Sequence, residues 1–544
     1  MWSQVYDPFG SMVLSTLVAA IPVVVLLGAI GLFEIRAHVA AALGLVAALV
    51  VAIFGVGMPA PMALAAAGYG AAFGLLPIGW IILNVIFLYQ LTNEKGVFDV
   101  LQRSISTISN DRRLQLLFIA FSLGAFFEGA AGFGTPVAVT AAILMGLGFR
   151  PLQASGLSLI ANTAPVAFGG LGTPLIALQA VTGLDLLELS GMVGRQLPFF
   201  AVLVPFWLIW AFVGFRKMAE VWPPILVAGV SFAIPQYLVS NFHGPWLVDV
   251  VAAIVSMACL AAFLKVWQPA EPMTAVPGGE PLSTAAVAAD TPSAVRRAWM
   301  PWVILSVFVF AWGTPQLRAA IDGVWSAEYK VAGLHEQVQK VPPVVAAPVP
   351  EKAVLKLNIL SATGTGIFVS AIVAGLLLGY SPAGLAKVYG RTLHTVRYSL
   401  LTISCMMAIG FVTKYSGTDA TMGLAMANTG WTYPFFGTLI GWLGVALTGS
   451  DTSSNVLFGG LQKVTAEQLG LNPVLMAAAN SSGGVMGKMI DAQSIVVAST
   501  ATKWYGHEGS ILRFVFFHSV ALAVLVGMFV MGQAYLWPLT LLAP

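Results

Sequence analysis

The chain has 544 residues, of which 58% are hydrophobic and only 9% are charged, and its mean hydropathy is +0.89. Soluble domains carry roughly 25% charged residues, so this composition excludes a water-soluble fold. The net charge of +3 comes without a basic tail, which argues against a nucleic-acid partner.

Apolar runs of about 20 residues, the length of a membrane-spanning helix, recur along the whole chain. They divide into about twelve to fourteen segments, which lie near residues 12–33, 38–57, 62–91, 114–148, 152–181, 192–215, 221–240, 246–267, 299–313, 359–379, 397–412, 420–447, 455–500 and 511–537. Backbone at membrane depth must satisfy its own hydrogen bonds. We therefore expect an all-α polytopic membrane protein, embedded in the lipid bilayer.

The first run follows Asp7 rather than a basic cluster and lacks a small-residue cleavage site, so we expect a retained helix and not a signal peptide. Two later runs, 114–148 and 455–500, are longer than one span. Each can hold a span together with a re-entrant hairpin, in which irregular backbone is buried inside protein.

Two polar stretches divide the chain. Residues 268–298 are rich in Pro, Ala, Gly and Thr, and predict a flexible linker between an N-terminal transmembrane half, 1–267, and a C-terminal half, 299–544. Residues 315–357 are polar and Pro-rich. They predict an outer loop with a short helix from about Tyr329 to Lys340.

Basic residues gather in three of the loops, at Arg36, at Lys95, Arg103, Arg112 and Arg113, and at Lys387, Arg391 and Arg397. Because cytoplasmic loops carry an excess of Lys and Arg, we place these loops inside. The N-terminus and the 315–357 loop then lie outside, in the periplasm.

Two stretches of small and polar residues interrupt the apolar runs, FFEGAAGFGTP at 126–136 and LTGSDTSSN at 447–455. Aligning Gly129 with Gly449 requires a shift of 320 positions, and aligning Asn162 with Asn480 requires a shift of 318. Each half therefore has an acid-bearing break followed by an Ala-Asn-hydroxyl break. The alternative is chance, since Gly and Ala are abundant. A true repeat predicts a transporter in which broken helices meet near the bilayer midplane.

The chain also resembles the bacterial L-lactate permease family essentially from end to end. The resemblance rests on EGAAGFG at 128–134, ANTAPVAFG at 161–169, GRQLP at 194–198, SATGT at 361–365 and TGSDTSSN at 448–455, together with YDP at 6–8, GGV at 483–485 and GKMI at 487–490. It implies proton-coupled uptake of lactate, often with glycolate and the other lactate enantiomer, across the inner membrane. The linker, the outer loop and Thr135 depart from the family pattern, which puts fine substrate preference in doubt.

A 2-hydroxy monocarboxylate needs cationic or N–H donors for its carboxylate and a partner for its hydroxyl. Helix N-termini at the two breaks can aim free N–H groups and positive dipole ends at an anion. The candidate substrate-binding residues at these breaks are Asn162, Thr163, Ser453, Ser454, Asn455 and Asn480. The alternative is that these side chains only satisfy unpaired backbone.

Two basic residues are candidates for binding the carboxylate. Lys488 lies within an apolar stretch, where a cation at membrane depth is costly and usually functional. The alternatives are an ion pair with Asp491, three residues later on the same helical face, or a side chain that extends to the surface. Arg195 is the second candidate, and it could equally anchor a helix end at the membrane boundary.

Glu128 and Asp451 are the candidate coupling residues. Apolar surroundings favour the neutral form of a carboxyl group, as a proton carrier requires. The hydroxyls around Asp451 could equally help to coordinate Na⁺, and either acid could merely cap a broken helix. Only Cys259 and Cys405 are present, far apart, so we expect neither a disulfide framework nor a thiolate metal site, and no cofactor.

Together these features predict a secondary active transporter and not an enzyme, namely a proton-coupled symporter of L-lactate, D-lactate and glycolate. A Na⁺-coupled carboxylate carrier is the closest alternative. A respiratory membrane subunit would need paired histidines or clustered cysteines, and a channel would need rings of acids lining a pore.

Overall fold

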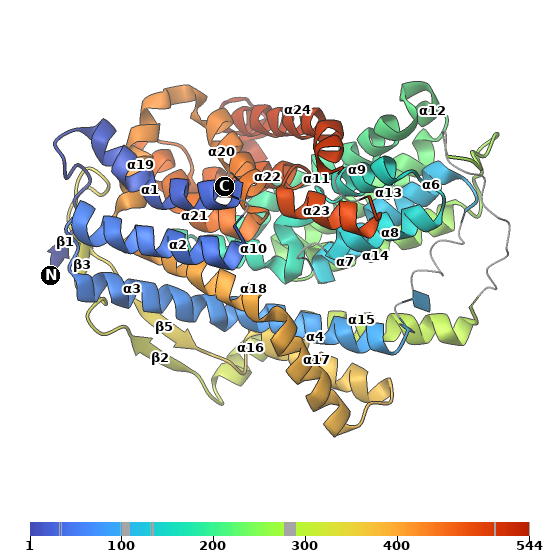
Figure 1. The fold of residues 1–544 in the computed structure, drawn as a ribbon, viewed down its shortest axis with the longest axis horizontal. Helices are drawn as coiled ribbons and strands as arrows, with labels where there is room; N and C mark the ends of the chain where they lie inside the picture. The colour runs from blue at the N-terminus through green and yellow to red at the C-terminus, as the bar shows by residue number, and fades with distance from the viewer. Residues whose placement is uncertain are drawn as a thin grey trace.

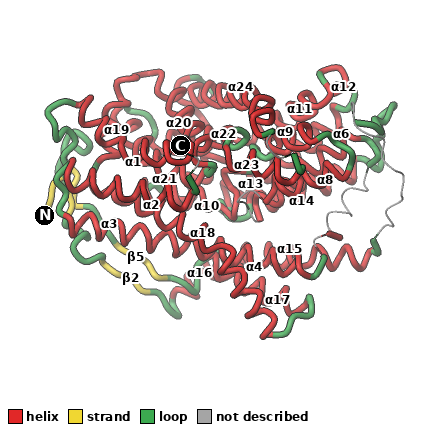
Figure 2. The backbone as a smooth tube through the Cα atoms, in the orientation of Figure 1, coloured by secondary structure: helices red, strands yellow, loops and turns green. Residues whose placement is uncertain are grey.

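The computed structural model describes residues 1–544 except 32, 34, 98, 101–108, 131, 133–134, 277–289, 505–506 and 543–544. The described chain is almost entirely helical, with a few short strands at one end (Figure 2). The expectation of an all-α polytopic membrane protein is therefore confirmed.

Seven helical segments of the described chain are long and apolar enough to cross a membrane. They are His38–Gly55, Ala60–Glu94, Arg112–Ala130, Leu186–Val213, Trp222–Phe242, Pro382–Ser416 and Glu508–Tyr535, and a bent pair, Pro151–Ala161 with Val166–Thr182, raises the number to eight. The helices formed by the other apolar runs do not meet both the length and the hydropathy required of a span, so the described residues contain fewer continuous candidate spans than apolar runs.

The helices of the N-terminal part follow the apolar runs closely. In chain order they are α1 (Met12–Gly31), α2 (Ala37–Val50) with η1 (Val51–Gly55), α3 (Ala60–Phe73), η2 (Gly74–Gly79), α4 (Trp80–Glu94), α6 (Arg112–Leu116), η3 (Leu117–Leu123), α7 (Gly124–Ala130), α8 (Thr135–Gly146), α9 (Pro151–Ala161), η4 (Val166–Phe168), α10 (Gly169–Thr182), α11 (Leu186–Val213), α12 (Phe215–Ala219), α13 (Trp222–Phe242) and α14 (Val248–Phe263).

The C-terminal part is built in the same way. Its helices are α15 (Pro292–Gly313), α16 (Pro315–Asp322), α17 (Thr363–Leu377), α18 (Pro382–Ser416), α19 (Thr418–Met426), η5 (Ala427–Thr432), α20 (Tyr433–Thr448), α21 (Asp451–Gln468), α22 (Pro473–Gly487), α23 (Ala492–Ala501), α24 (Glu508–Tyr535) and η6 (Leu539–Leu542).

Two pairs of segments in the two parts repeat one another at the same offset. The continuous segment Ala60–Glu94 and helix α18 both have 35 residues, and residue 382 lies 322 positions after residue 60. Helices α11 and α24 both have 28 residues, and residue 508 again lies 322 positions after residue 186. The expected repeat is therefore present, but its register is 322 and not the 318 to 320 obtained by matching Gly and Asn residues.

Equivalent segments of the two repeats pack antiparallel. Along α3 and α4 the partners on α18 occur in descending order: Gly70 lies against Met407, Gly74 against Ile403, and Glu94 pairs with Arg391. The contacts are also reciprocal, since α10 packs on α21 as α23 packs on α8. Reciprocal contacts indicate that a two-fold axis relates the two repeats. Because equivalent helices run antiparallel, this axis is perpendicular to the helices. This is the inverted topology found in many transporters.

Glycine allows this close packing. A Cβ placed on Gly70 would lie 2.4 Å from the Met407 carbonyl oxygen, and one on Gly74 would lie 2.8 Å from the Ile403 carbonyl oxygen. Small residues at helix crossings let backbones approach in membrane proteins. The α3–α4 segment and α18 therefore form one tight unit, along the lower part of the view in Figure 1.

The predicted breaks at the two acids are confirmed. Helix α7 ends two residues before Gly132, whose φ is +58°, and α20 ends at Gly449, whose φ is +72°. The break at Asn162 is also present, and α9 and the α10 segment are bent there by 65°. Ala131, Phe133, Gly134 and the side chain of Thr135 lie outside the described residues.

The predicted break at Asn480 is wrong. Asn480 lies in the middle of α22, and the interruption comes at Lys488, where α22 ends and α23 has not begun. The Asn480 side chain bonds to neighbouring helices and leaves its own helix intact, because Nδ2 donates to Asn455 Oδ1 over 2.9 Å.

The outer loop contains strands where a short helix was predicted. Strand β2 (Ala327–Lys330) pairs antiparallel with β5 (Val354–Leu357). Strand β3 (Val338–Lys340) pairs with β4 (Val349–Pro350), and it pairs in parallel with β1 (Trp2–Ser3) at the N-terminus. The helix from Tyr329 to Lys340 is therefore wrong, since these residues gain backbone partners from distant strands. The N-terminus and the 315–357 loop lie on the same side, as expected.

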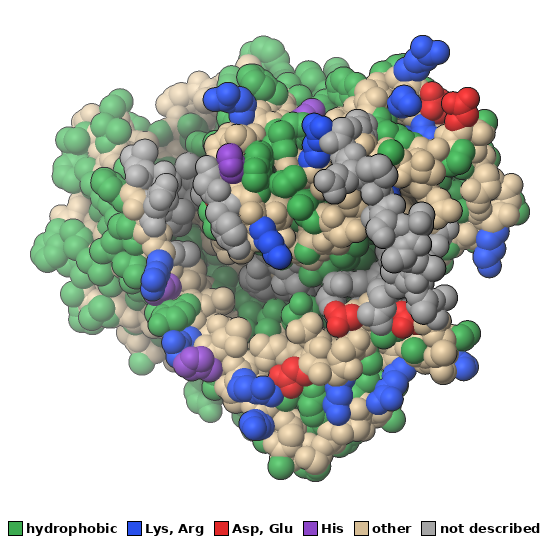
Figure 3. Space-filling view, turned by 45° about the vertical axis from the view of Figure 1, so that its right-hand side comes forward, with side chains coloured by type: hydrophobic (Ala, Val, Ile, Leu, Met, Phe, Trp, Pro, Cys, Tyr) green, Lys and Arg blue, Asp and Glu red, His purple; other side chains and the backbone are tan. Residues whose placement is uncertain are grey.

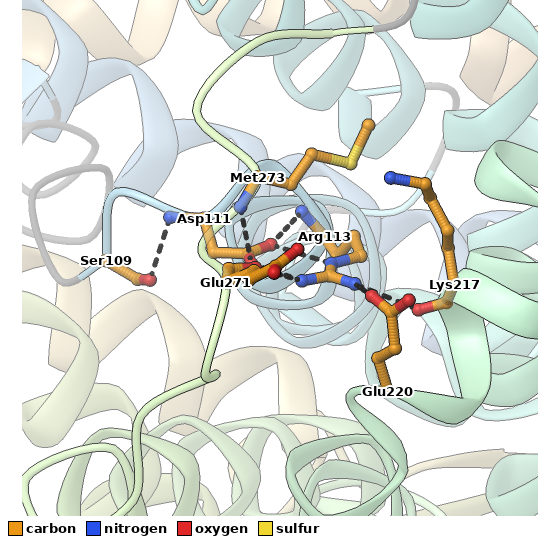
Figure 4. Close-up of polar contacts among 7 residues, drawn as sticks. All are labelled: Ser109, Asp111, Arg113, Lys217, Glu220, Glu271 and Met273. Atoms are coloured by element: carbon orange, nitrogen blue, oxygen red, sulfur yellow. Dashed lines mark hydrogen bonds and ion pairs between the residues drawn. The ribbon is translucent and has the colours of Figure 1, made fainter.

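The start of the linker is attached to the opposite end of the bundle. The buried Arg113 donates to Asp111 Oδ2 over 2.8 Å, to Glu220 Oε2 over 2.8 Å and to the Glu271 carbonyl oxygen over 3.2 Å, while Asp111 Oδ2 accepts from the Met273 amide (Figure 4). Linker residues 277–289 lie outside the described part, as does Arg103, and α15 already begins at Pro292.

A cleft separates the α3–α4/α18 unit from the helices around α8. It is lined by Tyr89 and Asn93 of α4 on one side and by Val139 and Ala142 of α8 on the other, with a volume of about 390 Å³. The space-filling view is hollowed between its upper and lower parts (Figure 3). These two bodies share one continuous hydrophobic core elsewhere, and the cleft separates them on this face.

Candidate functional site

A small polar cavity lies where the broken helices of both repeats meet. Its wall comes from α7, from the first residues of α10, from the N-terminus of α21, and from the segment between α22 and α23. The centre of a water molecule can occupy a volume of about 80 Å³ in this cavity. By the same measure one water needs roughly 10–15 Å³. The cavity can therefore hold a small polar molecule or several waters.

Asp451 is one of the acids in the cavity wall. It follows the N-cap Ser450, whose Oγ accepts from the Ser453 amide over 3.2 Å. Asp451 Oδ2 accepts from Asn455 Nδ2 over 3.4 Å and from the Ser481 hydroxyl. Asp451 Oδ1 has no hydrogen-bond partner among the described residues. One oxygen is thus held by hydrogen bonds, and the other is buried beside Gly484 without a hydrogen-bond partner in the described part of the chain.

Glu128 is the second acid in the wall. It is 5% exposed, and its Oε2 accepts from Asn162 Nδ2 over 3.1 Å. Gly169 gives it room, because a Cβ there would lie 2.5 Å from Glu128 Oε1. Each repeat therefore places one acid at the cavity and holds it with one asparagine.

Lys488 is the cation of the cavity. Its Nζ donates to the Gly449 carbonyl oxygen over 2.6 Å and lies 3.5 Å from Asp491 Oδ2. The pairing with Asp491, which the sequence left open, is therefore present. Asp491 in turn caps α23 through the Ser494 amide, over 2.7 Å. Lys488 thereby connects both interruptions of the C-terminal repeat.

The other candidate polar residues support the wall without lining it. Asn162 caps α9 and reaches the cavity only through Glu128, and the Thr163 hydroxyl donates to the Ile160 carbonyl oxygen over 2.8 Å. The Ser454 hydroxyl donates to the Gly441 carbonyl oxygen over 3.1 Å. The Ser453 amide is used by the N-cap.

Asn455 and Asn480 belong to a buried network behind α21. Asn455 Nδ2 donates to the Pro174 carbonyl oxygen over 3.2 Å, which joins the two repeats. Asn480 accepts from Gln462 Nε2 over 3.1 Å. These residues hold α21 and α22 in position, and the cavity wall contains neither of them.

Arg195 does not line the cavity. It lies ten residues into α11 rather than at a helix start, its Nε donates to Asn241 Oδ1 over 2.9 Å, and its Nη1 donates to the Leu542 carbonyl oxygen over 3.3 Å. Arg195 therefore joins α11 to the end of α13 and to the C-terminal η6.

The sequence analysis missed the wall formed by the start of α10. Gly170, Leu171 and Gly172 all have positive φ, which turns the chain sharply before Thr173 and Pro174. The pattern Gly-x-Gly-Thr-Pro occurs at 132–136 and again at 170–174, and this duplication could have revealed the wall. The two turns touch, since a Cβ on Gly132 would lie 3.2 Å from the Gly170 amide nitrogen.

The site combines features that attract an anion with carboxyl groups that repel one. The N-terminus of α21 faces the cavity and favours negative charge. Among the described residues, Glu128 and Asp451 line the cavity together with Lys488, and Asp491 lies 3.5 Å from the Lys488 ammonium. Carboxyl groups therefore outnumber ammonium groups here, and ionised carboxylates would repel an anion.

Broken helices that meet at a buried cavity within inverted repeats define a secondary membrane transporter. The family model described as L-lactate permease matches residues 15–537. The chain belongs to the L-lactate permease family, which makes it a multi-pass membrane transporter and not an enzyme.

Individual relatives agree with this assignment. The chain is 46% identical to glycolate permease GlcA of Escherichia coli strain K12, covering 98% of each chain. It is 44% identical to L-lactate permease of Bacillus subtilis strain 168, covering 96% of this chain and 97% of the relative, and 43% identical to L-lactate permease of E. coli K12, covering 98% of each. Among solved structures, the YdaH transporter of Alcanivorax borkumensis matches 88% of each chain with a TM-score of 0.43 at 12% identity, a likeness too low to bear on the assignment.

Proposed function

We propose that the protein is a proton-coupled symporter that takes up L-lactate, D-lactate and glycolate across the bacterial inner membrane. The names of the relatives support this substrate class, because both lactate and glycolate permeases match along nearly the whole chain. The single observation that carries the coupling is the excess of carboxyl groups near Lys488 in this polar cavity.

In this proposal the substrate carboxylate binds at Lys488 and at the N-terminus of α21, where Ser450 and Thr452 line the cavity. The 2-hydroxyl group bonds to the Thr452 or Thr173 hydroxyl, both of which face the same space. Asn162, Asn455 and Asn480 act indirectly, since they bond to the acids and to the helices that carry the wall.

Coupling follows from the cost of moving uncompensated charge through the membrane. With Glu128 and Asp451 ionised, the empty site carries excess negative charge and its movement is disfavoured. A proton together with a monocarboxylate enters as a neutral set, so the loaded site moves more readily. The two-body architecture, with a cleft between α4 and α8, supports movement of one body against the other.

We further propose that the N-terminus and the 315–357 loop face the periplasm. The basic residues support this orientation, because Lys95 lies over the Tyr380 ring and Arg391 pairs with Glu94, which groups two of the positive loops at one end.

The experiment is uptake of labelled L-lactate into proteoliposomes with an acidic exterior, with and without Na⁺. We expect accumulation driven by the proton gradient alone. Unlabelled D-lactate and glycolate should compete, whereas propionate, which lacks the hydroxyl, should compete at least about tenfold less well because a site built for a hydroxyl penalises its absence. Uptake that requires Na⁺ and ignores the pH gradient would instead make Asp451 part of a sodium site.

A further inference from the structure

Asp249 is a buried acid that the proposed mechanism does not use. It lies in the first turn of α14 and is 1% exposed, and neither of its carboxyl oxygens has a hydrogen-bond partner among the described residues. The acids around the cavity differ, since Glu128, Asp451 and Asp491 each accept at least one hydrogen bond. An ionised carboxylate without partners is costly to bury, so we expect Asp249 to carry a proton at neutral pH.

Asp249 is in direct contact with the helix that carries Glu128. A Cβ placed on Gly129 would lie 2.6 Å from Asp249 Cβ and 3.0 Å from the Val250 amide nitrogen. Glycine is therefore needed at the position after Glu128, so that α14 can approach α7 this closely. This contact brings two buried acids, Glu128 and Asp249, onto directly packed helices.

Glu128 is the principal charged group that faces Asp249. Helix α14 packs against α7, η3, α10 and α13. Segments η3, α10 and α13 contain no Asp, Glu, Lys, Arg or His, although α13 contains Tyr237, which is titratable but exposed. Glu128 is the only charged residue of α7. In the loop before α14, the His243 ring lies against Trp246, at 6.0 Å between ring centres. The nearest cation of the cavity is Lys488, which interacts electrostatically with Glu128.

We propose that Asp249 is a second proton-binding carboxyl group of the transport site, whose ionisation is coupled to that of Glu128. This inference rests on the proposed proton symport. Glu128 lines the cavity and Asp249 lies behind it. An ionised Asp249 disfavours ionisation of Glu128, and the reverse, so the two carboxyl groups titrate as a coupled pair. Such a pair binds its last proton more tightly than a single carboxyl group would.

The test is Asp249→Asn in the full-length protein in proteoliposomes, with the pH dependence of gradient-driven lactate uptake as the readout. We expect the half-maximal pH to move about one unit or more toward acid, because a single carboxyl binds its proton less tightly than a repelling pair. Lactate exchange at equal pH on both sides should stay within about twofold of wild type. Asp185→Asn, a helix-cap acid of α11, is the matched control and should shift neither quantity.

Infrared difference spectroscopy gives a second readout that does not depend on transport. At neutral pH the wild-type protein should show a protonated carboxyl band that Asp249→Asn lacks. The proposed role of Asp249 is overturned if uptake by the wild type is driven by the proton gradient but the pH profile of Asp249→Asn is unchanged. If Asp249→Asn cannot exchange lactate, the infrared spectrum decides, and the absence of the protonated carboxyl band in the wild type overturns the role. Wild-type uptake that ignores the pH gradient overturns the proposed function itself.

Discussion

Lys488 Nζ lies 2.6 Å from the carbonyl oxygen of Gly449, a residue 39 positions earlier in the chain. Gly449 is the left-handed turn that ends α20, and its carbonyl has no partner within that helix terminus. One ammonium group therefore stabilises the break that carries Asp451 and also faces the cavity. The link explains how a single cation can be structural and still bind substrate.

Replacing Lys488 should affect both stability and transport. We expect Lys488→Met to abolish measurable lactate uptake and to destabilise the fold by about 3–5 kcal/mol, because Asp491 loses its buried partner. The double variant Lys488→Met/Asp491→Asn removes the unpaired charge and should recover much of the thermal stability but no transport. Transport at wild-type rates in the stable double variant would show that Lys488 does not bind the carboxylate.

The two cavity acids should separate exchange from accumulation. In Glu128→Gln the amide keeps the size of the side chain and can still bond to Asn162, but it carries no titratable proton. We expect lactate exchange within about threefold of wild type and a loss of gradient-driven accumulation of at least about tenfold. Exchange and net uptake are measured in the same liposomes, and Asp451→Asn is compared directly. Accumulation retained in both variants would exclude these acids from coupling.

Helix packing between the repeats should depend on Gly70 and not on its neighbour Gly68. A Cβ on Gly70 would lie 2.4 Å from the Met407 carbonyl oxygen, whereas a Cβ on Gly68 meets nothing within 4 Å. We expect Gly70→Ala to destabilise the protein by about 1–3 kcal/mol and Gly68→Ala to be neutral or stabilising by up to about 1 kcal/mol. Unfolding midpoints in detergent compare the two. Equal midpoints would contradict the antiparallel contact.

The linker attachment predicts a difference between two acids that bind the same arginine. Asp111 and Arg113 are both 1% exposed, while Glu220 is 49% exposed. Asp111→Asn should cost up to about 3–5 kcal/mol, because the buried Arg113 then keeps only the half-exposed Glu220 as a charged partner, and it should expose residues 268–276 to protease. Glu220→Gln should cost at most about 1 kcal/mol. Limited proteolysis with cleavage-site mapping tests this, and equal cleavage of both variants would argue against the attachment.

Much of the helical architecture could be predicted from the sequence, because apolar length and membrane thickness together determine which runs form helices. The breaks at Glu128 and Asp451 were also predictable, since they combine acids with clustered small residues that interrupt an apolar run. The register of the repeat could not be predicted, because abundant Gly and Ala residues allow several plausible alignments of the two halves. The equal helix lengths that identify the register appear only in the structure.

Other parts depend on tertiary contacts that no local pattern reveals. Asn480 looks like a break, yet its amide bonds to Asn455 and Gln462 on α21 and its own helix continues. The strands near Tyr329 and Lys340 form because β5 and the N-terminal β1 supply partners from distant parts of the chain. Arg195 was a candidate by charge alone, and its partners at Asn241 and Leu542 could not be foreseen.

The most direct test of the proposed function is the movement of protons that accompanies lactate. Purified protein in liposomes containing a pH-sensitive dye, free of Na⁺ and with the membrane potential clamped at zero, is mixed with external L-lactate, and internal pH is followed together with labelled uptake. Symport of anion and proton as a neutral set predicts internal acidification in step with lactate entry, lost in Glu128→Gln or Asp451→Asn. Lactate entry without acidification, or entry only after Na⁺ is added, would contradict proton coupling.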